Sequence, residues 1–173
     1  MMKIVAAFLF GTQRLAAFKL DFVNFIHRAS IRELLLVFAE QASSEEGRKL
    51  FTYSQQYHFV CCRYSDVAVV LVTDTEYPTR ISFELVERIF QTPGQQILSY
   101  VIDMCQDPRQ IDMIFRVRQK LDETLVIAHE NIEKIIASGD DLDILVSKSA
   151  KLSDSTKIFY RTARRHNRCC NIL

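Results

Sequence analysis

The sequence predicts an α+β protein in which a sheet-and-helix head precedes a long helical segment. Short apolar runs separated by turn residues fill much of the first 74 residues, as strands of a sheet do. Apolar residues at helical spacing follow Ser30 and again follow Thr79. From Arg109 to Leu173 the 65 residues contain no proline and a single glycine, a composition that favours helix.

Five segments of the head have strand character. Residues 3–10 and 14–20 are separated by Gly11-Thr12-Gln13 and predict a β-hairpin. Residues 50–54, 57–64 and 67–73 supply three more strands. The last of these is almost wholly apolar, which predicts a central strand buried on both faces between helices.

Three helices are expected in the same region. Ser30 and Glu33 form an S-x-x-E capping box, which predicts a helix over residues 31–42. A turn at residues 76–79 leads into a second helix, and Pro93-Gly94 separates it from a third over residues 95–106. The predicted order is β-β-α-β-β-β-α-α, and the head of about 107 residues has an ordinary domain size.

The remaining segment is too long to be one helix inside the head. Residues 110–165 would span roughly 84 Å as a continuous helix, whereas a domain of this size has a radius of gyration of about 13 Å. The segment must therefore be broken and wrapped on the head, or project and pair with other helices.

A heptad pattern runs through this segment and predicts a coiled-coil seam. Small polar residues such as Thr124, Asn131 and Thr156 interrupt it, and a bundle of several helices tolerates them better than a homodimeric zipper does. The alternative is a long amphipathic helix that packs on its own head. The predicted seam consists of Ile114, Val117, Leu121, Ala128, Ile135, Ser138, Leu142, Leu145, Leu152 and Phe159.

The C-terminal residues have the pattern of a lipidated tail. Cys170-Asn171-Ile172-Leu173 reads as a C-a-a-X box with Cys170 as the prenyl acceptor, and leucine in the last place suggests geranylgeranyl. Cys169 offers a second lipid site. Stable attachment takes two signals, two lipids or one lipid beside a basic patch, and such a patch precedes the cysteines at Arg161, Arg164, Arg165 and Arg168.

Composition argues against several other functions. The net charge of +1 is unlike that of a nucleic-acid binder, and no apolar run reaches the length of a transmembrane helix. The five cysteines, an odd number with two adjacent pairs, form neither a disulfide framework nor a C-x-x-C pattern and indicate a reducing, cytosolic compartment. The four histidines have no ligand spacing, and neither a phosphate-binding loop nor a catalytic constellation is recognisable. We expect no metal, no cofactor apart from covalent lipid, and no enzymatic activity.

Three blocks in the C-terminal segment carry a family resemblance: Gln119–Thr124, Gly139–Ser149 and Phe159–Arg164, followed by Cys169-Cys170. With the head motifs His27–Ser30 and Glu76–Arg80, they resemble the prenylated, synaptobrevin-like longin SNAREs of the YKT-six kind. The resemblance covers nearly the whole chain.

This resemblance implies a longin fold, a profilin-like five-stranded antiparallel sheet between helices. It divides the chain into a longin domain (1–107), a SNARE coiled-coil motif (108–164) and a lipidated tail (165–173). It implies membrane fusion in vesicle-mediated transport, with one helix given to a four-helix bundle with Q-type SNAREs. It also implies a head that folds back on the SNARE helix, and residence in the cytosol and on the cytoplasmic face of Golgi, ER and vesicle membranes.

The chain departs from the family at one position of the seam. The family carries arginine at the central polar layer, immediately before the glycine, and this chain has Ser138 there. Serine cannot make the charge-assisted hydrogen bonds that arginine makes to three glutamines. A non-fusogenic longin adaptor or tether with a regulatory helix is therefore the alternative function.

Overall fold

The fold of the chain was obtained as a computed structural model, which describes residues 3–53, 56–108, 111, 128–129 and 139–169. Its elements in chain order are β1 (Ile4–Phe10), β2 (Leu15–Phe18), the 3-10 helix η1 (Phe25–His27), α1 (Arg28–Ala42), β3 (Gly47–Tyr53), β4 (Tyr57–Tyr64), β5 (Val67–Asp74), α2 (Thr79–Gln91), α3 (Gln95–Met104), β6 (Ala128–His129), α6 (Gly139–Lys148) and α7 (Asp154–Cys169).

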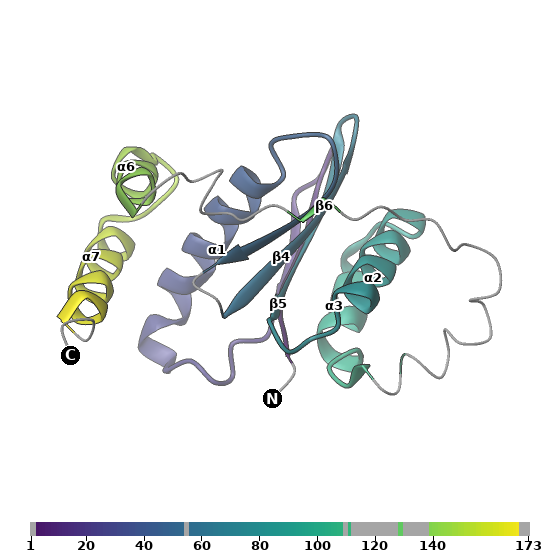
Figure 1. Ribbon diagram of the computed structural model, residues 1–173, viewed down its shortest axis with the longest axis horizontal. Coiled ribbons are helices and arrows are strands. Elements are labelled where there is room, and N and C mark those ends of the chain that lie inside the picture. Colours follow the sequence, from purple (N-terminus) through teal and green to yellow (C-terminus); the bar gives the residue numbers. More distant parts are fainter. Residues whose placement is uncertain (1–2, 54–55, 109–110, 112–127, 130–138, 170–173) are drawn as a thin grey trace.

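A single sheet organises the molecule, with helices on both of its faces (Figure 1). Its strand order is β2-β1-β5-β4-β3-β6, and the first five strands pair antiparallel. Helix α1 covers one face, and α2 and α3 cover the other. The predicted α+β class and its five antiparallel strands between helices are thus confirmed.

The central strand β5 divides the hydrophobic core into two layers. Val69 and Leu71 face the layer built with α2 and α3, whereas Val70 and Val72 face the layer built with α1. Because successive side chains of a strand point to opposite faces, an all-apolar strand fits between two helical layers. The sequence-based prediction of a strand buried on both faces is correct.

The sheet has one strand that the sequence did not predict. The two-residue strand β6 pairs parallel with β3, with Ala128 opposite Lys49 and His129 opposite Leu50. Without β6, the β3 edge of the sheet would lie open, and an open edge presents unpaired backbone groups that invite pairing. A short segment of the predicted SNARE motif thus occupies the edge of the head's sheet.

Helix α1 begins earlier than predicted and without the predicted capping box. It starts at Arg28, directly after η1, and no side chain caps its N-terminus. The capping side chain is that of Asn24, which accepts a 3.3 Å hydrogen bond from the backbone N–H of Ile26 in η1. The carboxylate of Glu33 binds a distant part of the chain instead.

The C-terminal segment is broken and wrapped on the head rather than extended as one helix. Residues 149–153 separate α6 from α7, and both helices lie on the α1 side of the molecule. Val146 and Leu152 complete the α1 layer of the core. Of the two arrangements that the length of the segment allowed, this structure has the wrapped one.

A buried tyrosine joins α2 to the end of α3 and provides a test of the core. Tyr77 is 1% exposed, and its hydroxyl donates a 2.7 Å hydrogen bond to the carbonyl of Cys105. We expect Tyr77→Phe to lower the free energy of unfolding by about 1–2 kcal/mol, because a buried carbonyl loses its donor. Urea unfolding followed by circular dichroism measures the change. Tyr100→Phe, at a tyrosine that is 40% exposed, is the control, and equal midpoints for both variants would contradict the expectation.

Candidate functional site

The contact between the C-terminal helices and α1 is the most extensive feature outside the sheet core. Helix α7 runs antiparallel to α1. Ser153, just before α7, contacts Glu33, and further along α7 Phe159 contacts His27, which precedes Glu33 in the chain. The two rings stack with centroids 4.8 Å apart and planes inclined by 29°. We call residues 3–107 the head, and the surface of α1 that receives α6 and α7 the docking face.

A strip of apolar side chains carries the docking. Val146 and Leu152 are 1% and 5% exposed, and Thr156 in the first turn of α7 is 1% exposed. Leu145, Phe159 and Tyr160 pack against the same core layer from partly exposed positions. Burial of apolar area at about 25 cal/mol per Å² makes this strip the main source of docking stability.

Polar contacts fix the register of the docked helices. The carboxylate of Glu33 accepts hydrogen bonds from the backbone N–H of Ser153 at 2.9 Å and from its hydroxyl at 2.8 Å. The Ser153 hydroxyl oxygen in turn accepts from the backbone N–H of Thr156 and caps α7. A negative charge at the N-terminus of a helix is also favoured by the helix dipole.

The docked state perturbs the ionisation of this carboxyl. The hydrogen bond from the Ser153 backbone lowers the pKa of Glu33 below its ordinary value of 4.5; partial burial opposes this shift, and the hydroxyls of Thr156 and Ser153 assist it. A lowered pKa in the docked state means that this contact contributes fully above pH 4.5 and is lost as the pH falls through the lowered pKa.

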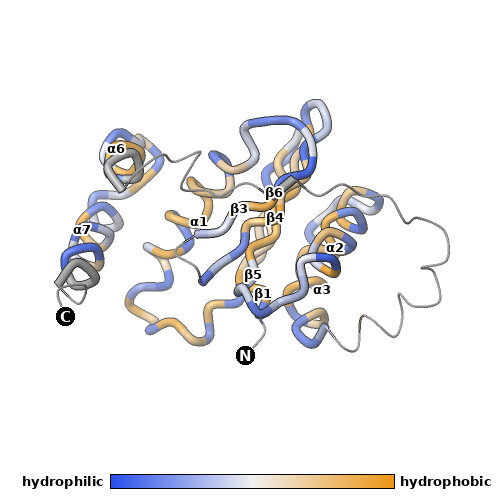
Figure 2. Tube along the Cα trace, viewed as in Figure 1, coloured by the Kyte–Doolittle hydropathy of each residue, from blue (hydrophilic) through white to orange (hydrophobic). Residues whose placement is uncertain are grey.

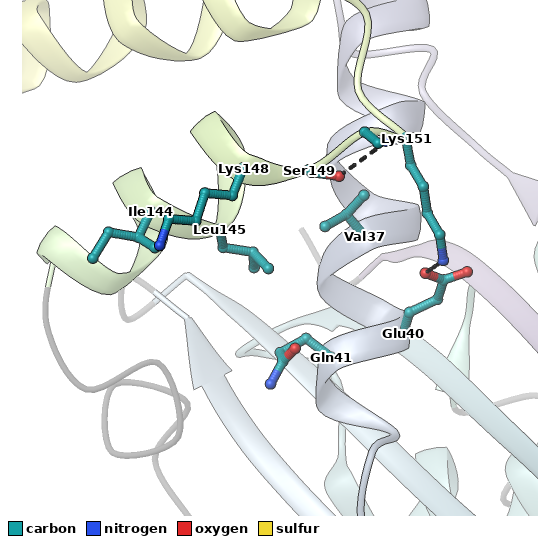
Figure 3. Close-up of a pocket in the computed structure, with 9 residues that line it drawn as sticks. Val37, Glu40, Gln41, Ile144, Leu145, Lys148, Ser149 and Lys151 are labelled. Carbon is teal, nitrogen blue, oxygen red and sulfur yellow. Dashed lines mark hydrogen bonds and ion pairs between the residues drawn. The ribbon is translucent and has the colours of Figure 1, made fainter.

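A second carboxylate on α1 anchors the link between α6 and α7. Glu40 pairs with Arg14 at 2.5 Å and with Lys151. Beside it lies a pocket of about 490 Å³ between α1 and α6, with Val37 and Gln41 on one wall and Leu145 on the other. Figure 3 shows Lys151 reaching down to Glu40 while Leu145 points toward α1.

The structure places part of the predicted seam on the docking face. Leu145, Leu152 and Phe159 lie together there, whereas Leu142 belongs to α6 and Ala128 to the strand β6. The helical geometry predicted at Ala128 is absent from this docked form, because its backbone pairs with the open edge of β3. Ile114, Val117, Leu121, Ile135 and Ser138 lie outside the described residues.

The basic and cysteine residues of the tail follow the docked part of α7. Arg161 and Arg165 are exposed, and Arg164 pairs with Asp143 of α6. Arg168 and Cys169 belong to the last turn of α7, and Cys170 lies outside the described residues. Of the helices that the structure describes, none is both long and apolar enough to cross a membrane. In the same residues no three His, Cys, Asp or Glu side chains gather into a group able to hold a metal ion.

Sequence reasoning missed the head side of this contact. The sequence predicts only a capping role for Glu33, and it predicts no contact of His27, Val37 or Glu40 with the C-terminal segment. Ser153 followed by an acid in the first turn, Asp154, is a recognisable helix start and signals the break before α7. Its partner on α1 has no such local signal, because 120 residues separate Glu33 from Ser153.

Comparison with known proteins identifies what the docked segment is. Residues 113–172 match the Synaptobrevin family. The chain is 33% identical to the synaptobrevin homolog YKT6 of Saccharomyces cerevisiae, over 87% of this chain and 86% of that protein. It is 32% identical to the homologs of Candida glabrata, over 87% and 84%, and of Schizosaccharomyces pombe, over 86% and 85%.

These matches include the head as well as the C-terminal segment, and they agree with the predicted resemblance. The family acts through SNARE assembly and not through catalysis, and a role in vesicle transport follows from it. The chain belongs to the synaptobrevin homolog YKT6 family of SNARE proteins.

Proposed function

We propose that the chain is a membrane-fusion SNARE that gives one helix to a four-helix bundle with three Q-type SNARE helices. The described arrangement is its closed form, in which the head withholds that helix. The observation that carries the proposal is the double use of Leu145, Leu152 and Phe159, which belong to the heptad seam and also contact the docking face.

The two uses exclude each other. A seam residue in a bundle packs into a hole formed by residues of the partner helices, and a side chain buried on α1 is not available for that packing. The strand β6 excludes assembly as well, because Ala128 cannot be extended on β3 and helical in a bundle at once. Assembly therefore requires the segment to leave the head, and its apparent affinity is reduced by the fraction of molecules that are open.

Lipid attachment at Cys170, with a second lipid at Cys169, would place the C-terminal end of the bundle at the membrane. The exposed Arg161 and Arg165 on the last turns of α7 suit an anionic leaflet, where each basic residue near the surface is worth about 1 kcal/mol. We propose residues 1–107 as the longin domain, 108–164 as the SNARE motif and 165–173 as the tail. We expect the protein in the cytosol and on the cytoplasmic face of Golgi, ER and vesicle membranes.

Ser138 favours a second candidate, a longin adaptor or tether that uses its helix for regulation and does not drive fusion. The serine lacks the charge of the arginine that the family carries before Gly139. A bundle centred on Ser138 would leave the glutamines of its Q-type partners without charge-assisted hydrogen bonds, each worth about 1.5–3 kcal/mol.

The closed form gives the first prediction. Glu33→Ala removes the acceptor of both Ser153 hydrogen bonds, so we expect α7 to open more often and its backbone amides to exchange about fivefold faster at neutral pH. Assembly with Q-type SNARE helices should accelerate in parallel. Hydrogen exchange with mass spectrometry measures the first effect. Glu46→Ala, at an exposed acid on the α1–β3 turn, is the matched control. Exchange that is equal in both variants would argue against docking through Glu33.

The seam gives the second prediction. Leu142→Asp together with Leu145→Asp should abolish assembly with Q-type helices, because two charges enter an apolar layer of the bundle. Leu145 also packs on the docking face, so the double change weakens docking of α6 on the head. A loss of assembly in this variant therefore cannot result from a more stable closed form. Native gel mobility of the mixture measures assembly. Ile144→Asp, on the 48% exposed face of α6, is the control, and retained assembly of the double variant would remove these residues from the seam.

The tail gives the third prediction. Cys170→Ser should shift the protein from membranes to the cytosol, and mass spectrometry of the C-terminal peptide should find a prenyl group on Cys170 of the wild type. Asn171→Ser keeps the C-a-a-X pattern and should leave both results unchanged. Unmodified Cys170 in wild-type protein from cells would contradict the anchor.

A liposome-fusion assay with Q-type partners separates the two candidate functions. We expect the wild type to drive lipid mixing, and Ser138→Arg to increase its rate because the central layer gains charge-assisted hydrogen bonds. Assembly without lipid mixing, in the wild type and in Ser138→Arg alike, would favour the adaptor.

A further inference from the structure

An exposed apolar loop lies between β2 and α1. Phe25 is 82% exposed, Ile26 75% and Phe22 47%. Single exposed apolar residues are ordinary on a protein surface, but these three lie within five positions of the chain, and clustered exposed apolar surface marks interaction sites. Figure 2 shows hydrophobic colour along this connection at the lower edge of the molecule. We call residues 22–26 the apolar loop.

Hydrogen bonds to its backbone fix the conformation of the apolar loop. The guanidinium of Arg28 donates to the carbonyl of Val23 at 3.0 Å and to that of Asp21 at 3.4 Å. The backbone N–H of Val23 donates to the carbonyl of Leu20, which is itself buried. The cap of η1 by Asn24 fixes the far end. In this arrangement the three apolar side chains of the loop are exposed to solvent.

The loop lies at the same end of the molecule as the last turns of α7. Phe159 stacks on His27, the residue directly after Ile26, and α7 runs antiparallel to α1. The ten residues from Phe159 to Cys169 extend about 15 Å further along the helix axis, beyond the start of α1. Figure 1 shows the β2–α1 connection, the end of α7 and the N-terminus along one edge.

The charges around the loop favour an anionic partner. The Lys3 ammonium lies 5.0 Å from the centre of the Phe22 ring, and the exposed Arg161 and Arg165 follow on α7. Lys19 is 4.0 Å from Asp103, and these two charges offset each other. Asp21 is the exposed acid within the connection. Two further acids lie near Lys3: Asp74, whose backbone N–H donates to the Lys3 carbonyl, and the exposed Glu76. The cations at this end are Lys3, Arg28, Arg161 and Arg165, against the acids Asp21, Asp74 and Glu76.

We propose that the apolar loop inserts into the interfacial region of an anionic lipid bilayer, with Phe22, Phe25 and Ile26 among the acyl chains and Lys3, Arg161 and Arg165 at the headgroups. Aromatic and aliphatic tips beside basic residues are the composition of surfaces that lie in the membrane interface. The proposal rests on the proposed function, in which the tail after α7 is anchored in a membrane and this end of the molecule therefore faces the bilayer. It adds a contact through which the closed form itself, with its SNARE helix docked, binds a membrane.

The absence of tryptophan from the chain makes the depth of the loop directly measurable. Cys169→Ser and Cys170→Ser in the full chain remove any lipid anchor at these cysteines, and Phe25→Trp then places a single tryptophan in the loop, which is excited selectively over the six tyrosines. With vesicles of phosphatidylcholine and phosphatidylserine we expect a blue shift of its emission and quenching by brominated acyl chains. High salt or pure phosphatidylcholine should weaken both effects.

Tyr64→Trp in the same background is the matched control. Tyr64 is 53% exposed at the end of β4, opposite Val67, whereas Lys3 and the loop lie at the other end of the sheet, where Ile4 pairs with Thr73. Its emission should not change with vesicles. A blue shift at both positions would indicate nonspecific adsorption and overturn the proposal.

A second measurement uses the loop without a fluorophore. Phe25→Ser with Ile26→Ser should weaken cosedimentation with anionic vesicles at least about tenfold, because two apolar side chains leave the interface. Ile144→Ser on α6, also exposed, should bind as the parent does. Equal binding of the loop variant and its parent overturns the proposal.

Three further outcomes would also overturn it. Concentration-dependent dimers that Phe25→Ser abolishes would assign the loop to a second copy of the chain. Fluorescence unchanged by vesicles but blue-shifted by a protein partner would assign it to that partner. A shift confined to the lipidated chain without vesicles would assign it to the chain's own lipid. Since the vesicle assays use the chain without its terminal cysteines, they test the loop whatever the tail carries, and failure of the anchor at Cys170 is detected separately.

Discussion

The apolar strip of α6 and α7 must be buried, and it can be buried against only one partner at a time. In the closed form the partner is α1, where Val146 and Leu152 are almost completely removed from solvent. In a SNARE bundle it would be three other helices. The polar contacts made by Glu33 and Glu40 lie at solvent-accessible positions and add less free energy than apolar burial does, so they set the register of a contact whose stability comes from the strip.

This constraint also explains why the segment is broken. A continuous helix would present its apolar stripe along its whole length, and α1, at fifteen residues, can cover only a part of it. The break at residues 149–153 lets α6 and α7 approach α1 separately, with Leu145 packed beside the pocket and Phe159 on His27. A further part of the segment, Ala128 and His129, pairs its backbone with the edge strand β3 instead of forming helix.

Local sequence pattern predicted the elements of the fold but not their distant partners. The all-apolar strand at residues 67–73 and the amphipathic helices were recognisable because periodicity reports how many faces an element buries. The start of α1 was predicted wrongly because the local role assumed for Glu33 competes with Ser153, far along the chain. The heptad pattern located Leu145, Leu152 and Phe159 as residues to be buried, but it carries no information on whether α1 or another protein buries them. Strand β6 is two residues long and depends on the β3 edge, so no window of sequence could predict it.

A membrane contact on the head would link membrane binding to docking of the SNARE helix. If the lipid were the sole attachment, docking of the SNARE helix and membrane binding would be independent, because the docking strip and the tail share no residues. The apolar loop couples them, since α7 reaches that end of the molecule only while Phe159 lies on His27. A bilayer that binds the loop and the basic end of α7 together would stabilise the docked arrangement, by the linkage that ties any ligand to the state it prefers. Membrane binding and closure would then support each other, and Q-type helices would compete against both.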